Sequence, residues 1–169
     1  MKRLITATIM GIALTGCSSE PKQNEPLGFK IGMTTDDARK IVNLTNYERT
    51  NNGRINYAKS GKVEADPVQP EYDYLYTFHG EKLNMITATY KGKENVQKAE
   101  KYLNKVANCE KTDSAEGQLR RYTCYEYGAR KGDYSRILAE FSEFTSSMTG
   151  ETSATIQYVY QKVNHQYKN

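Results

Sequence analysis

The sequence predicts an α+β fold in which a helix followed by three antiparallel strands occurs twice, with both helices packed on one face of the sheet. Three observations lead to this expectation. Two segments repeat apolar residues at intervals of three and four, as amphipathic helices do. Several others alternate apolar and polar residues, as half-buried strands do. Short turns rich in glycine and polar residues join these into hairpins.

The first repeat is expected in residues 27–92. Thr34 is a good N-cap, and apolar residues follow at helical spacing from Ala38 onward, so a helix is predicted over about 35–44. The polar residues 46–53 are typical of a turn. Strands are predicted over 55–60, 72–79 and 83–90, with a proline-containing loop over 63–70.

The second repeat is expected in residues 93–169. Val96, Ala99 and Leu103 step along a lysine-rich segment at helical spacing, which predicts a helix over about 94–108. The segment 135–144 fits helical spacing as well as strand alternation, and a strand is preferred because the clear strand that follows needs a partner. Strands are therefore predicted over 118–127, 135–144 and 153–162.

The first seventeen residues have the pattern of an export signal. Lys2 and Arg3 precede an uncharged, mostly apolar stretch over 4–14 that is too short to span a bilayer. Leu-Thr-Gly-Cys at 14–17 resembles the lipobox of bacterial lipoproteins, which implies cleavage before Cys17 and lipid on that cysteine. The alternative is a plain signal peptide with a chance cysteine.

The lipobox resemblance also implies a location. Lipoproteins of this kind are retained in the inner membrane by an aspartate after the lipidated cysteine, whereas this chain has Ser18. That favours the outer membrane of a Gram-negative cell, with the chain facing the periplasm. Residues 1–16 would be the signal peptide, 17–26 the lipidated cysteine and a flexible tether, and 27–169 a single periplasmic domain.

The charge balance argues against nucleic acid as a partner. Lys2 and Arg3 are two of the 24 basic residues, so the exported part has 22 against 20 acidic residues. A nucleic-acid-binding domain would instead need a clustered basic surface. No second apolar run is long enough to cross a membrane, which indicates that the lipid alone anchors the domain.

Two cysteines remain after lipidation, Cys109 and Cys124. In the oxidising periplasm such a pair predicts a disulfide, which would contribute ~3 kcal/mol for a short loop. Metal binding is the alternative, but it needs further ligands, and the histidines His79 and His165 are distant in sequence. We therefore expect neither a metal site nor a cofactor.

Phe-Lys-Ile-Gly-Met-Thr at 29–34, with the helix that follows, resembles the beginning of two kinds of protein. One is the small lipoprotein subunit of the outer-membrane β-barrel assembly machinery, and the other is β-lactamase inhibitor protein. The resemblance covers residues 27–44. It implies tandem helix-plus-sheet repeats and a domain that binds proteins through its sheet and loops, without enzymatic activity.

No catalytic motif is found in the sequence. There is no Gly-x-Ser-x-Gly elbow, no glycine-rich phosphate loop and no His-Glu-x-x-His. His79 follows a predicted strand beside a glycine turn, and an exposed hairpin residue is favoured there over an acid or base without a visible partner. We therefore do not expect an enzyme.

Tyrosine is abundant, with fourteen residues and no tryptophan. Tyrosine and arginine are enriched at binding hot spots, so a recognition surface on the sheet is one hypothesis. The alternative is that strand tyrosines pack in the core, as their β-propensity allows. The candidate protein-binding residues are Tyr74, Tyr76, Phe78, Arg120, Arg121, Tyr122, Tyr158 and Tyr160.

Together these features predict a non-catalytic, membrane-anchored envelope lipoprotein that binds an envelope protein. It would act as an accessory of outer-membrane assembly or as an inhibitor of a hydrolase. The alternative is a glycan- or lipid-binding envelope protein that uses its tyrosines as stacking platforms.

Overall fold

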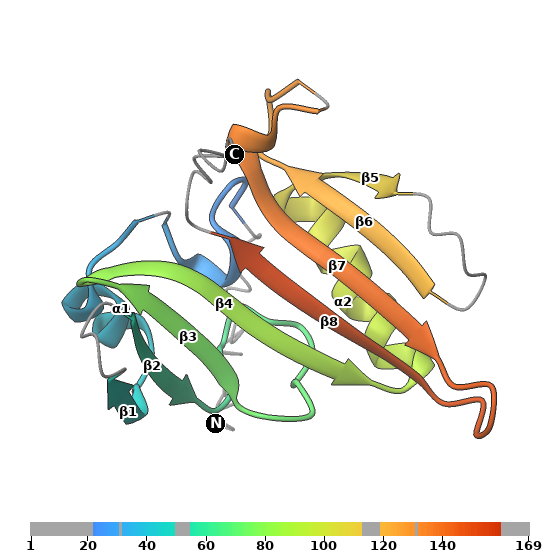
Figure 1. The fold of residues 1–169 in the computed structure, drawn as a ribbon, viewed down its shortest axis with the longest axis horizontal. Helices are drawn as coiled ribbons and strands as arrows, with labels where there is room; N and C mark the ends of the chain where they lie inside the picture. Colours follow the sequence, from blue (N-terminus) through green and yellow to red (C-terminus); the bar gives the residue numbers. More distant parts are fainter. Residues whose placement is uncertain (1–21, 31, 50–54, 113–118, 131, 160–169) are drawn as a thin grey trace, which may run out of the picture.

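The computed structural model describes residues 22–30, 32–49, 55–112, 119–130 and 132–159. Within these ranges the chain forms two α-helices, two short 3-10 helices and one antiparallel sheet (Figure 1), which confirms the expected α+β class. The elements are η1 (Pro26–Gly28), α1 (Thr35–Ile41), β1 (Thr45–Arg49), β2 (Ile55–Ser60), β3 (Tyr74–His79), β4 (Lys82–Lys91), α2 (Lys93–Val106), β5 (Asn108–Thr112), β6 (Leu119–Tyr125), η2 (Tyr134–Arg136), β7 (Ile137–Thr145) and β8 (Thr152–Val159).

The strand order shows two meanders joined at their last strands. In the described part of the chain the sheet has eight strands in the order β1-β2-β3-β4-β8-β7-β6-β5. Strands β1 to β4 follow α1, and β5 to β8 follow α2, so the chain is a helix and then four strands, twice. The two halves meet where β4 pairs antiparallel with β8.

The expectation of three strands per repeat is therefore not confirmed. Each half has an additional strand, β1 or β5, directly after its helix and at an outer edge of the sheet. Both are short and polar, Thr-Asn-Tyr-Glu-Arg and Asn-Cys-Glu-Lys-Thr, as edge strands often are. Because β1 has no apolar alternation, the sequence predicted a turn over residues 46–53 there.

Helix α1 begins where the sequence predicts, because Thr34 accepts a hydrogen bond from the amide of Asp37 at 3.2 Å. It ends earlier than expected, at Ile41, since Val42 is already extended, with φ −139° and ψ 152°. Val42 is buried all the same. A helix this short covers only part of the first half of the sheet.

Helix α2 lies across the second half of the sheet, behind β5 to β8 in the view of Figure 1, and contacts β4, β5 and β8. Its buried stripe has the spacing that the sequence predicts. The helix stops at Val106, and β5 follows almost at once. The residues of the stripe are Val96, Ala99, Tyr102, Leu103 and Val106.

The core lies between the helices and the sheet face that points toward them. Cross-strand pairing places Ile86 beside both Tyr76 and Tyr158, and Ala88 beside Ile156, so these side chains share that face. Because α1 is short, the loop over residues 61–73 completes the cover of the first half. Its buried residues are Val63, Asp66, Val68 and Pro70.

The N-terminal segment is part of the domain from Asn24 onward. The amide of Asn24 donates to the carbonyl of Val106 at 2.9 Å, and its side chain accepts from the amide of Tyr127 at 2.8 Å. Pro26 and Leu27 are buried. The expectation of a flexible tether over 17–26 is corrected here, since its last three residues are fixed against the core; residues 17–21 lie outside the described ranges.

Cys109 and Cys124 face each other across the β5–β6 pair, and their sulfur atoms are 2.09 Å apart, at disulfide distance. The bridge holds the outer strand β5 to its neighbour. Across the ranges that the structure describes, no helix combines the length and the apolar character needed to cross a membrane.

Candidate functional site

Four of the candidate binding residues lie in the core. Tyr74, Tyr76, Phe78 and Tyr158 are each 0% exposed, on the face of the sheet that the helices cover. The hypothesis that they form a recognition surface is therefore corrected. The alternation holds along β8, and along β3 it holds up to the register shift between Thr77 and Phe78. In both strands the large aromatic side chains point inward, where they fill the core.

A buried carboxylate explains how some of these tyrosine hydroxyls are satisfied. Asp66, only 5% exposed, accepts hydrogen bonds from Tyr74 at 2.5 Å and from the Tyr90 hydroxyl. Its other oxygen accepts from the amide of Val68 at 2.9 Å. Burial raises the pKa of Asp66, and the three hydrogen bonds oppose that shift.

The role of Asp66 is to fasten loop 61–73 to β3 and β4. Burial also raises the pKa values of the Tyr74 and Tyr90 hydroxyls, which therefore remain donors. Sequence reasoning missed Asp66. The sequence does contain a signal, an acidic residue between the apolar Val63 and Val68 in a segment that was predicted to be a loop. In the structure both valines are buried.

Arg120 and Tyr122, two further candidates, lie on the helix-facing side near the N-terminal half of α2. Arg120 forms an ion pair with Glu143 and a longer one with Glu100, at 3.4 Å. Its guanidinium lies 5.9 Å from the centre of the Tyr122 ring, which packs edge-on against Phe141. The hydrogen bond to Glu143 raises the pKa of Arg120 and keeps it charged.

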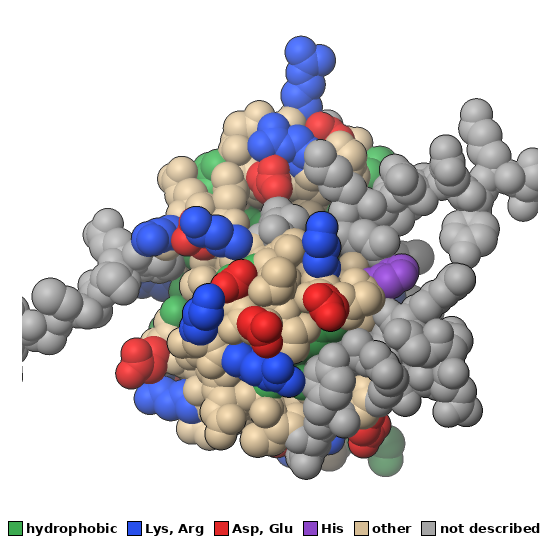
Figure 2. Space-filling view, turned by 90° about the vertical axis from the view of Figure 1, so that its left-hand side faces the viewer, with side chains coloured by type: hydrophobic (Ala, Val, Ile, Leu, Met, Phe, Trp, Pro, Cys, Tyr) green, Lys and Arg blue, Asp and Glu red, His purple; other side chains and the backbone are tan. Residues whose placement is uncertain are grey.

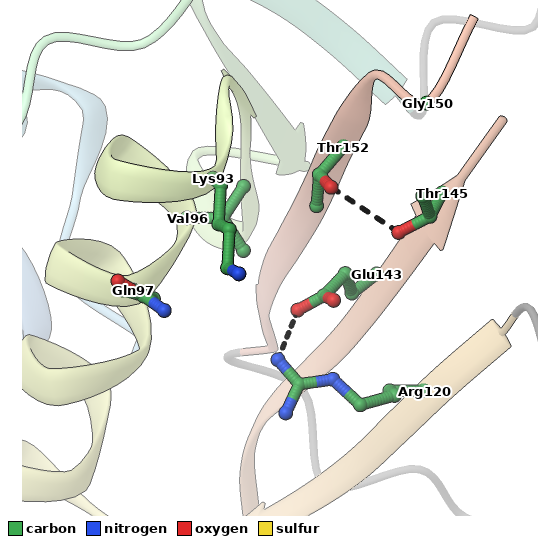
Figure 3. Close-up of a pocket in the computed structure, with 8 residues that line it drawn as sticks. All are labelled: Lys93, Val96, Gln97, Arg120, Glu143, Thr145, Gly150 and Thr152. Carbon is green, nitrogen blue, oxygen red and sulfur yellow. Dashed lines mark hydrogen bonds and ion pairs between the residues drawn. The ribbon is translucent and has the colours of Figure 1, made fainter.

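Arg120 and Glu143 border a hollow of about 300 Å³ between α2 and the ends of β6, β7 and β8. Figure 3 shows Arg120 reaching across to Glu143, while Thr145 and Thr152 are joined by a 3.2 Å hydrogen bond. The lining offers hydrogen bonds to a small polar group. The lining residues are Lys93, Val96, Gln97, Arg120, Glu143, Thr145, Gly150 and Thr152.

The structure separates Arg121 from its neighbours in sequence. Arg121 is exposed on the opposite face of the sheet, across from Ser142. Tyr160 and the expected lipidation site Cys17 lie outside the described residues. His79 is exposed at the end of β3, as the sequence predicts. The candidate residues thus do not form one cluster.

The sheet face that carries Arg121 is the open face, because the contacts of both helices lie on the other side (Figure 1). On it β4 and β8 form four facing pairs. Three are uncharged, among them Met85 opposite Val159 and Thr89 opposite Thr155, and in the fourth Ser153 lies opposite Lys91 at the end of the row. The seven uncharged side chains of these pairs are half-buried. We call this group the β4–β8 seam: Met85, Thr87, Thr89, Ser153, Thr155, Gln157 and Val159.

Apolar side chains border the seam on one side. Phe144 of β7 lies between Ser153 and Leu119 on the open face and is 48% exposed. Met148, in the β7–β8 turn that follows, is 94% exposed. Exposed apolar side chains beside an uncharged sheet surface are what a protein partner would cover.

Charges elsewhere are mixed in sign. On the side that carries α1, Lys and Arg alternate with Asp and Glu among the described residues (Figure 2). Arg39 pairs with Asp36 at 3.2 Å, and Lys40 with Asp37 at 2.7 Å. In the described ranges no three His, Cys, Asp or Glu residues are grouped as metal ligands would be.

The chain was compared with protein-family models, with curated proteins and with solved structures, and none of them matches it.

Proposed function

We propose that this chain is an outer-membrane lipoprotein whose periplasmic domain binds a protein through the open face of its sheet, without catalysing a reaction. The observation that carries the proposal is the β4–β8 seam, an uncharged and half-buried surface at the centre of a sheet face that neither helix covers.

The composition of the seam fits a protein partner. The centre of a protein interface is depleted of charged residues, and its rim is polar. Here the charged residues of the open face, such as Lys91 and Arg121, lie around the uncharged seam. The seam runs for roughly 20 Å along the strands, enough for an extended segment or a loop of a partner. Phe144 supplies an apolar contact beside it.

The structure weakens the support for glycan binding. Sugar stacking needs exposed aromatic rings, and the tyrosines of β3 and β8 are buried; the exposed rings of Tyr72 and Tyr134 lie outside the strands. Depletion of peptidoglycan fragments by the purified domain would revive that alternative.

The lipobox at 14–17 supplies the rest of the proposal. Lipid on Cys17 would hold the domain beside the membrane, where its partners are envelope proteins. Either of two roles fits such a module: an accessory of outer-membrane assembly or an inhibitor of a hydrolase that reaches the periplasm. Both follow from the resemblance of residues 29–34.

Site-specific photocrosslinking in cells tests the proposal with a matched pair of glutamines. Gln157 lies in the seam, and Gln69 is exposed on loop 61–73, on the other side of the sheet. A photoreactive residue at position 157 should give discrete adducts with an envelope protein, and one at position 69 should not. Absence of adducts at 157, or the same adducts at both positions, would contradict the proposal.

A further inference from the structure

The N-terminal segment determines which end of the domain lies next to the anchor. Asn24 is bound on one side to Val106, at the end of α2, and on the other to Tyr127, at the start of the β6–β7 connection. The chain therefore enters the domain at the end formed by these two elements. In Figure 1 the blue N-terminal segment and the orange connection lie together at the top.

Little chain separates this end from the lipidated cysteine. Seven residue steps join Cys17 to Asn24, and even a fully extended chain of that length reaches only about 25 Å. Strand β7 alone, with nine residues, is roughly 30 Å long. The end that holds Asn24 must therefore remain close to the membrane, while the β7–β8 turn can lie much further away.

The described residues of the β6–β7 connection, 126–130 and 132–136, are held in place by their own hydrogen bonds. The amide of Ala129 donates to the backbone carbonyl of Glu126 at 3.0 Å, and the amide of Asp133 donates to the backbone carbonyl of Arg130 at 3.1 Å. An ion pair of 2.8 Å between Arg136 and Glu126 closes its base. The connection is thus a fixed projection of the domain.

The side chains at this end suit a lipid surface. Tyr134, the first residue of η2, is 58% exposed, and tyrosine favours the boundary between lipid and water. Arg130 in the connection and Lys105 in the last turn of α2 are both exposed. A basic residue near an anionic lipid surface strengthens binding to it. The nearby Glu126 is already paired with Arg136.

We propose that the described residues of the β6–β7 connection rest on the headgroups of the membrane that holds the anchor, with Tyr134 and Arg130 in contact with lipid. This inference rests on the proposed lipidation of Cys17. It gives the domain an orientation in which the strands run away from the membrane, so that the open face stands upright and the β7–β8 turn points outward.

Lipid-headgroup quenching tests this orientation. The full chain, purified from bacterial envelopes with its anchor, is placed in vesicles of phosphatidylethanolamine and phosphatidylglycerol containing a headgroup-nitroxide lipid. A fluorophore is attached in the Tyr134→Cys variant and, as control, in Met148→Cys, where the native side chain is 94% exposed. Quenching at position 134 should be several-fold stronger than at 148. Equal quenching, or stronger quenching at 148, would overturn the inference.

Two further readouts separate failure of the anchor from failure of the orientation. Flotation of the wild-type chain with vesicles and the mass of its N-terminal peptide report the lipid on Cys17. If the lipid is absent, the lipoprotein proposal and this inference fail together. If the chain is lipidated and floats but the two positions are quenched equally, only the orientation fails. The double variant Arg130→Glu, Lys105→Glu should lower quenching at 134 in anionic vesicles.

Discussion

At the scale of single residues, Asp66 shows how this domain uses a buried charge. Its carboxylate helps to tie loop 61–73 to the sheet, together with the hydrogen bond from the Glu71 amide to the Thr89 carbonyl, and it accepts hydrogen bonds from the hydroxyls of two tyrosines that the core needs for their volume. Such a group is costly to bury, and its hydrogen bonds offset part of that cost. Burial raises the pKa of Asp66, and the pH dependence of stability therefore measures the cost of burying its charge.

The pH dependence of stability should reveal the ionisation of Asp66. Burial in the folded protein raises the pKa of Asp66 above its ordinary value of 3.8, so the folded protein holds the proton more tightly than the unfolded chain. Its contribution to the free energy of unfolding is then fully present below the unfolded pKa and is lost as the pH rises through the folded pKa. The stability of wild type minus that of Asp66→Asn should therefore fall as the pH rises from about 3.5 upward.

Urea unfolding of both proteins across pH 3.5 to 8 measures this difference. Asp66→Asn keeps an acceptor for the Val68 amide and has no titrating group, so it is the proper reference. The exposed Asp73→Asn is the matched control and should not reproduce the trend. A difference that grows with pH would show that hydrogen bonds, and not burial, dominate the ionisation of Asp66.

At the scale of elements, sequence patterns were informative wherever one side of an element is apolar. The periodicity of α2 and the alternation along β3, β4 and β8 predicted these four elements and their order along the chain. Strands β1 and β5 were missed because the edges of a sheet select polar residues, and their pairing depends on partners far along the chain. The inward direction of Tyr74 and Tyr76 could not be predicted either, since alternation alone does not say which face the helices cover.

The disulfide should hold strand β5 in place. Cys109 and Cys124 are separated by 15 residues, and a loop of that size predicts a loss of about 3 kcal/mol in the double variant Cys109→Ala, Cys124→Ala. Urea unfolding with and without reductant checks this. Reductant should lower the midpoint of wild type and leave that of the variant unchanged, whereas an unchanged wild type would contradict the prediction.

At the scale of the whole molecule, two helix-plus-four-strand halves form one sheet by pairing β4 with β8, and this pairing creates the seam. The sequence predicted a duplication and an α+β class from local patterns. It did not predict the seam, because that surface exists only where two strands more than sixty residues apart meet side by side. In the sequence alone, the threonines and the serine of the seam look like ordinary polar positions of a strand.

The central claim is that the open face binds a protein, and loss of the partner from a seam variant tests it most directly. Thr155→Arg places a large charge between Thr89 and Ser142, and Gln69→Arg makes the same charge change on the other side of the sheet. Both are purified with the anchor intact from detergent-solubilised envelopes after in-cell crosslinking, and their urea midpoints are compared with wild type. Thr155→Arg should lose the crosslinked partner at least tenfold while remaining folded, and Gln69→Arg should retain it. Equal retention by both variants would contradict the claim.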